Sequence, residues 1–121
     1  MATYGRVHVA LDTTPYNGTI TTCEALWMGV PVVCLAGGRH AARVSASLLN
    51  AVGKSEFAAQ STQEYVAIAV RLAQDRAALE QLRFGLRETM RNSPLLDTKN
   101  YSDRFYAALR QCWVTWCRAN A

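Results

Sequence analysis

Two short apolar segments that alternate with two helical segments constrain the fold more than any other feature of this sequence. Residues 7–11 and 31–35 are rich in valine and leucine, as expected for short strands that are buried on both faces. The residues between them, about 19–28, have a helical pattern, and so do residues 39–52. Strands joined by a helix normally run parallel. The first half therefore predicts an α/β fold with few parallel strands.

The second half of the chain predicts helices only. Residues 53–59 are expected to be a connector with, at most, a very short extended piece. Ser61 begins a capping-box pattern, and Asp75 is expected to cap the next helix. We therefore divide the chain into residues 7–59, with alternating strands and helices, and residues 60–121, with the carboxyl-terminal helices.

The last two predicted helices each carry a distinctive row of side chains. Arg83, Arg87 and Arg91 recur on one face, which indicates a solvent-exposed surface, with an acidic partner as the alternative. An aromatic stripe on the final helix is typical of a core or an interface. The stripe consists of Tyr101, Phe105, Leu109, Trp113 and Trp116.

The segment between the two predicted strands has the features of an anion site. Gly18 precedes a helix that opens with threonines, and Thr21 and Glu24 match the capping-box pattern. Free N–H groups at a helix start suit a phosphate group, although most threonine-rich starts are only caps. Residues 17–22 and 37–40 both follow a strand and are expected at the same sheet edge, where open α/β sheets bind ligands.

Composition excludes several other classes of protein. The 121 residues form one domain at most, and no apolar segment is long enough to span a membrane. No apolar signal region opens the chain, so a cytoplasmic location is the default expectation. The four cysteines and two histidines are not clustered as metal ligands, which predicts reduced thiols and no metal site. A net charge of +4 without a nucleic-acid-binding motif gives no reason to expect a nucleic-acid partner.

Only two convincing strands are visible, and so small a parallel sheet leaves its edges uncovered. This indicates the last part of a larger α/β domain. Residues 18–31, 41–47 and 61–65 resemble the carboxyl-terminal part of the catalytic region of O-linked N-acetylglucosamine transferases and SPINDLY-type glycosyltransferases. The resemblance implies a Rossmann-like partial domain, half of the donor-binding domain of a GT-B fold. A second Rossmann-like domain and tetratricopeptide repeats would precede it.

The resemblance also implies a nucleotide-sugar site. It assigns the donor diphosphate to Gly18, Thr19, Thr21 and Thr22, and the ribose hydroxyls to Glu24. Arg39 and His40 are candidates for contacts with the base or the phosphates, and a plain surface role is the alternative. The helix start departs from the N-acetylglucosamine transferases and is closer to the SPINDLY-type O-fucosyltransferases. Both UDP-N-acetylglucosamine and GDP-fucose therefore remain candidate donors.

The function implied is donor binding in an inverting, metal-independent transferase that modifies Ser or Thr of acceptor proteins. No catalytic residue is identifiable in these residues, so the isolated chain is expected to be inactive. In the family fold the final helix crosses toward the other domain, which would cover its aromatic stripe. Without that domain the stripe is exposed, so self-association through this helix is expected. The main alternative is a non-catalytic interaction module that docks through the aromatic helix. A flavodoxin-like regulator ranks last, because it needs about five parallel strands.

Overall fold

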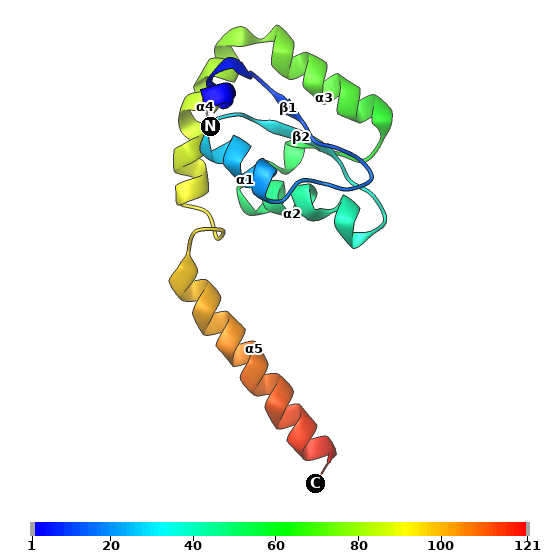
Figure 1. Cartoon of the computed structure of the whole chain (residues 1–121), viewed down its shortest axis with the longest axis vertical. Helices are drawn as coiled ribbons and strands as arrows, with labels where there is room; N and C mark the ends of the chain where they lie inside the picture. Colours follow the sequence, from blue (N-terminus) through cyan, green and yellow to red (C-terminus); the bar gives the residue numbers. More distant parts are fainter. Residues whose placement is uncertain (1, 121) are drawn as a thin grey trace.

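The computed structural model describes residues 2–120, which form a small parallel sheet between helices and a long helix that leaves this body (Figure 1). The strands are β1 (Ala10–Leu11), β2 (Val32–Leu35) and β3 (Ala58–Ala59). The α-helices are α1 (Ile20–Trp27), α2 (Val44–Ala51), α3 (Thr62–Gln74), α4 (Arg76–Arg91) and α5 (Thr98–Ala119). Short 3-10 helices cover Ala2–Arg6, His40–Ala42 and Ser55–Phe57. The predicted α/β class is confirmed. The strand predicted over residues 7–11 is shorter, because only Ala10 and Leu11 pair with β2, and it is not buried on both faces, because Leu11 is 57% exposed.

The strands lie in the order β1-β2-β3, and both pairs are parallel. Ala10 lies opposite Val32, and Cys34 lies opposite Ala58. Residues 53–59 were expected to be a connector with, at most, a very short extended piece, and that piece is the paired strand of Ala58 and Ala59. Two alanines carry no β-branched signal, and their pairing with β2 alone defines this strand.

Helix boundaries follow local capping in the second half of the chain. Ser61 Oγ accepts a hydrogen bond from Glu64 N at 3.2 Å, and Asp75 Oδ1 accepts one from Ala78 N at 3.0 Å. Both predicted caps are thus confirmed. The helix predicted over residues 39–52 is shorter, because residues 40–42 form a 3-10 turn before α2 begins at Val44.

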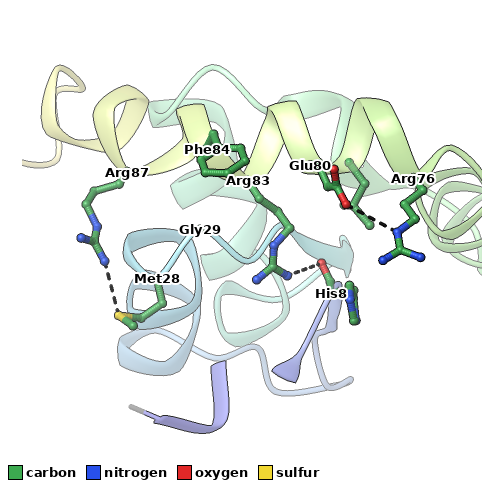
Figure 2. A pocket seen from close by; sticks show the side chains of 9 residues that line it. His8, Met28, Gly29, Arg76, Glu80, Arg83, Phe84 and Arg87 are labelled. Atoms are coloured by element: carbon green, nitrogen blue, oxygen red, sulfur yellow. Dashed lines mark hydrogen bonds and ion pairs between the residues drawn. The ribbon is translucent and has the colours of Figure 1, made fainter. Parts of the chain in front are cut away.

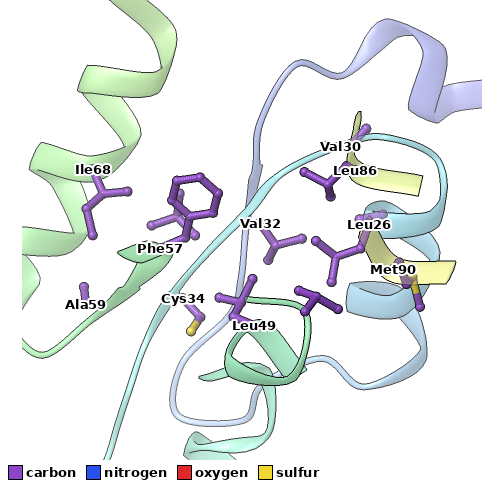
Figure 3. Packing of buried hydrophobic residues seen from close by; sticks show 13 residues of the cluster. Leu26, Val30, Val32, Cys34, Leu49, Phe57, Ala59, Ile68, Leu86 and Met90 are labelled. Atoms are coloured by element: carbon purple, nitrogen blue, oxygen red, sulfur yellow. The ribbon is translucent and has the colours of Figure 1, made fainter. Parts of the chain in front are cut away.

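The buried core surrounds β2. Val32, Val33 and Cys34 of this strand have exposed fractions of 2% or less, so both faces of the strand are covered. In Figure 3, Ile68 of α3 approaches β2 from one side, and Leu49 of α2 lies on the other. The remaining labelled members are Leu26, Val30, Phe57, Ala59, Leu86 and Met90. Burial on both faces explains why β2 is a continuous apolar segment.

Two arginines fasten α4 to the rest of the body (Figure 2). The Arg83 guanidinium donates to the carbonyls of Val7 and His8, with 3.2 Å to the oxygen of His8. Arg87 Nε donates to the carbonyl oxygen of Trp27 at 2.7 Å, at the end of α1. Arg87 and Arg91 are exposed as predicted. Arg83 and Arg87 also have a structural role, because their hydrogen bonds satisfy carbonyls outside α4.

Helix α5 projects away from the body (Figure 1), and none of its residues is buried. Phe105 is 49% exposed and Trp113 is 60% exposed. Trp113 and Trp116 stack on each other, with ring centroids 5.3 Å apart. The predicted aromatic stripe is thus present on the surface, where nothing among residues 2–120 covers it.

Two glycines with left-handed backbones provide a matched test of the packing between α1 and α4. Gly29 and Gly53 have φ values of +73° and +66°. A Cβ on Gly29 would lie 2.7 Å from the backbone oxygen of Arg83, whereas one on Gly53 would meet nothing within 4 Å. We expect Gly53→Ala to lower the free energy of unfolding by about 1 kcal/mol, and Gly29→Ala by about 2–4 kcal/mol. Urea denaturation measures both, and equal losses would contradict this close approach.

The uncovered stripe on α5 predicts self-association. Light scattering of the chain should show a mass that rises with concentration, because large apolar patches are seldom left bare in solution. Combined Trp113→Glu and Trp116→Glu substitutions should abolish this rise, and Gln111→Glu on the same exposed helix should not. A strictly monomeric wild-type chain at high concentration would contradict the prediction.

Candidate functional site

The loops that follow β1 and β2 meet at the carboxyl edge of the sheet. Asn17 N donates to the carbonyl oxygen of Ala41 at 2.8 Å, and Gly37 N donates to that of Ala42 at 2.8 Å. The first of these hydrogen bonds joins the two loops directly. The predicted proximity of residues 17–22 and 37–40 is therefore confirmed.

The amino end of α1 presents open backbone donors at this edge. Cys23 N bonds to the carbonyl of Thr19, which is the N-cap and makes no side-chain capping bond. Within residues 2–120, the N–H groups of Thr19, Ile20, Thr21 and Thr22 have no hydrogen-bond acceptor. The predicted capping box at Thr21 is therefore wrong. Open N–H groups at the positive end of a helix dipole attract an anion.

The backbone of Gly18, which precedes these donors, is hydrogen-bonded at both its N–H group and its carbonyl oxygen. Its N–H group donates to Asp12 Oδ1 at 2.9 Å. Its carbonyl oxygen accepts from Thr22 Oγ1 at 3.1 Å and from Ser45 Oγ at 2.9 Å. Thr22 is 3% exposed, so its hydroxyl faces the interior, whereas the side chains of Thr19 and Thr21 are exposed. Thr22 was predicted to contact the diphosphate. Only its N–H group is available for this contact, because its hydroxyl is buried.

Two acceptor atoms at this edge are buried without a donor among residues 2–120. They are Asp12 Oδ2 and Asn17 Oδ1. Asn17 is 1% exposed, and its Nδ2 donates to the carbonyl of Thr13 at 3.0 Å. A buried acceptor without a partner is costly, so a donor from outside these residues suits both positions.

Glu24 lies one turn into α1 and is partly buried. Tyr4 Oη donates to Glu24 Oε2 at 3.4 Å. Burial and, after it, the charge of Glu24 raise the pKa of the Tyr4 hydroxyl, which keeps it protonated as a donor. The carboxylate, one turn after the first helical residue, is therefore held by a donor from a distant segment.

Arg39 and His40 are exposed on the loop after β2. His40 lines a cavity of about 600 Å³ together with Arg43 and Asn50. The hydrogen bond between Asn17 and Ala41 brings this loop against the loop before α1. Both basic side chains are therefore on the same edge as the helix start, and their contacts with a ligand remain a prediction.

Sequence reasoning missed three residues that build this edge. Asp12 and Ser45 hold the Gly18 peptide, and Tyr65 Oη donates to the carbonyl of Asp12 at 3.0 Å. Asp12 follows β1 directly, so its position at a carboxyl strand end was a usable signal.

Burial, with the charge of Asp12 as a second cause, raises the pKa of the Cys34 thiol to about 11. This thiol is therefore neutral and belongs to the core.

A larger cavity of about 660 Å³ lies at the other end of α1 (Figure 2). It is lined by Met28, Gly29 and the arginines of α4 that bind backbone carbonyls. Because it adjoins the carboxyl end of α1, it lacks the open N–H groups of the helix start.

Among residues 2–120, no cluster of His, Cys, Asp and Glu could hold a metal ion. No helix in this range is both long and apolar enough to cross a membrane.

Comparison with known proteins gives the same family throughout. Residues 4–105 match the model of Glycosyl transferase family 41. One relative is a probable UDP-N-acetylglucosamine–peptide N-acetylglucosaminyltransferase SPINDLY of Oryza sativa subsp. japonica. It is 45% identical to the chain over 121 residues, and the match covers 100% of the chain and 13% of the rice protein. It is 39% identical, over 105 residues, to a UDP-N-acetylglucosamine–peptide N-acetylglucosaminyltransferase of Caenorhabditis elegans, covering 87% of the chain and 9% of that protein.

A solved structure agrees with these matches. A mutant of the Thermobaculum terrenum O-GlcNAc transferase is 41% identical to the chain, with a TM-score of 0.91 over 99% of the chain. The chain covers 23% of that protein. The predicted fold, a Rossmann-like part of a GT-B glycosyltransferase, is therefore confirmed. Compared with these relatives, the chain corresponds to a small part of a longer polypeptide.

Proposed function

Because the chain belongs to glycosyltransferase family 41, we propose that it forms the nucleotide-sugar donor-binding part of an inverting protein O-glycosyltransferase. The observation that carries this proposal is the group of unbonded N–H groups at Thr19–Thr22, on the carboxyl edge of the parallel sheet. The donor diphosphate lies against these groups, with the exposed hydroxyls of Thr19 and Thr21 as further donors. Gly18 allows the close approach.

The proposed role in catalysis is electrostatic. As the bond between sugar and phosphate breaks, negative charge grows on the leaving diphosphate. Fixed N–H groups and the helix dipole stabilise this charge more strongly than the charge of the intact donor, which lowers the barrier. In this proposal the helix start of α1 supplies that stabilisation without a metal ion. The catalytic base and the acceptor site for Ser or Thr side chains belong to other parts of a longer polypeptide.

Glu24 is the proposed contact for the ribose. A carboxylate accepts two hydrogen bonds from vicinal hydroxyls, and Glu24 lies one turn from the open N–H groups. Arg39 and His40 are the proposed contacts for the base or the phosphates. The names of the rice and nematode relatives favour UDP-N-acetylglucosamine as the donor. GDP-fucose remains the second candidate, because the helix start resembles the SPINDLY-type O-fucosyltransferases.

The exposed stripe on α5 supports a contact with a second protein surface. In a longer polypeptide, the proposed surface is that of the other Rossmann-like domain, and tetratricopeptide repeats would precede both domains. The alternative function, a non-catalytic module that docks through α5, rests on the same exposed tryptophans. Nucleotide binding separates the two proposals, because docking alone requires none.

Nucleoside diphosphate binding is the direct test of the site. On titration with UDP and with GDP, amide NMR signals of Thr19, Ile20 and Thr21 should shift. Glu24→Ala should weaken binding about tenfold, because the ribose loses a charged acceptor. Glu88→Ala, which removes an exposed carboxylate from α4, should leave the affinity unchanged. Shifts confined to the cavity beside Met28 and Gly29, or equal affinity of the two variants, would contradict the assignment.

A second prediction concerns the reaction. The 121 residues alone should transfer no radiolabelled sugar from either donor to an acceptor peptide, because no candidate general base was found in them. Turnover by this chain would show that its own residues include the missing catalytic group.

A further inference from the structure

We infer that Ser45, Thr22 and Asp12 are positioning residues for the diphosphate site, acting through the Gly18 peptide. This inference rests on the proposed function, since it concerns how the open N–H groups of α1 are kept open and aimed. Nothing in the sequence patterns assigns such a role to Ser45 or Asp12, and Thr22 was expected to touch the diphosphate with its hydroxyl.

Two side-chain hydroxyls bind the carbonyl oxygen of Gly18. Gly18 O is the acceptor that Thr22 N would use if the helix were extended by one residue at its amino end. Instead, Thr22 Oγ1 and Ser45 Oγ bond to this oxygen at 3.1 Å and 2.9 Å, and the two hydroxyls lie 3.0 Å apart. Ser45 is fully buried. The hydroxyls thus occupy the carbonyl, and the N–H group of Thr22 stays open for a ligand.

The N–H group of Gly18 is held by a carboxylate. Asp12 Oδ1 accepts from Gly18 N at 2.9 Å. The backbone of Asp12 is itself fixed, because its N–H group donates to Val33 O at 2.9 Å and its carbonyl accepts from Tyr65 Oη at 3.0 Å. The Gly18 peptide is therefore tied to the sheet on one side and to α2 on the other. Donors held in this way need no reorganisation when charge develops on a ligand.

Steric fit and unpaired acceptors agree with this role. A Cβ on Gly18 would lie 2.4 Å from Thr21 Oγ1 and 3.0 Å from Thr22 Oγ1, so a larger residue here would have to displace these hydroxyls. Asp12 Oδ2 and Asn17 Oδ1 are buried here without a donor among residues 2–120. These two acceptors require a donor, whereas the four open N–H groups require an acceptor, so a ligand that carries both kinds of group suits this edge of the sheet.

The test compares variants that remove one hydroxyl with variants that preserve it. Thr22→Val keeps the shape of the side chain and loses the hydroxyl, whereas Thr22→Ser keeps the hydroxyl; Ser45→Ala removes the partner on α2. The matched controls are Thr89→Val and Ser102→Ala. Their hydroxyls also donate to a carbonyl four residues earlier, at 3.0 Å and 2.9 Å, but on α4 and α5.

Affinities for UDP, GDP and uridine are measured where circular dichroism shows each variant folded. Thr22→Val and Ser45→Ala should weaken binding of the diphosphates about five- to tenfold, the effect of one hydrogen bond, and should leave uridine binding unchanged. Thr22→Ser and both controls should bind like the wild type. A merely structural role would move diphosphate and uridine binding together.

Each result separates the inference from the proposed function. Wild-type binding of UDP or GDP with unchanged affinity in Thr22→Val and Ser45→Ala would overturn the inference alone. No wild-type binding of either diphosphate would overturn the proposed function, and the inference with it. If Ser45→Ala does not fold, the comparison of Thr22→Val with Thr22→Ser tests the inference, because only Thr22→Ser keeps a hydroxyl at residue 22.

Discussion

The parallel pairing of β2 with both of its neighbours is the constraint on which the rest of the structure depends. Because β1 and β2 run in the same direction, the loops that follow them emerge at one edge, where Asn17 N bonds to Ala41 O. Pairing with β3 then covers the second side of β2 and allows α2 and α3 to pack on opposite faces (Figure 1). A short strand with three buried residues thus brings together segments that are more than twenty residues apart in sequence.

Packing and chemistry have opposite requirements at the amino end of α1. Stability favours capped helix ends, yet four N–H groups remain open here while hydroxyls occupy the neighbouring carbonyl. The opposite end of the same helix is closed: Arg87 bonds to Trp27 O, and Gly29 fits tightly under Arg83. One end of α1 is therefore bound firmly to α4, and the other end is left able to bind an anion. This division is what a ligand site on a rigid element requires.

The sequence predicted the elements that have strong local signals and missed those defined by tertiary contacts. Valine-rich segments identified β1 and β2, and capping residues identified the starts of α3 and α4. Ala58 and Ala59 gave no signal, because only pairing with β2 makes them a strand. Arg83 was missed as a structural residue for the same reason, since the carbonyl of His8 that it binds lies 75 residues away along the chain. At the site, the family resemblance predicted which residues contact the ligand. Only the structure showed which hydrogen bonds hold Gly18 in place.

The most direct test of the central claim is a crystal structure of this chain with UDP or GDP bound. The account predicts phosphate oxygens within hydrogen-bond distance of the backbone nitrogens of Thr19 to Thr22, with the ribose beside Glu24 and the Gly18 peptide unmoved. A nucleotide bound in the cavity between Met28 and Arg83 would contradict it, and so would a bound nucleotide that makes no phosphate contact at the start of α1.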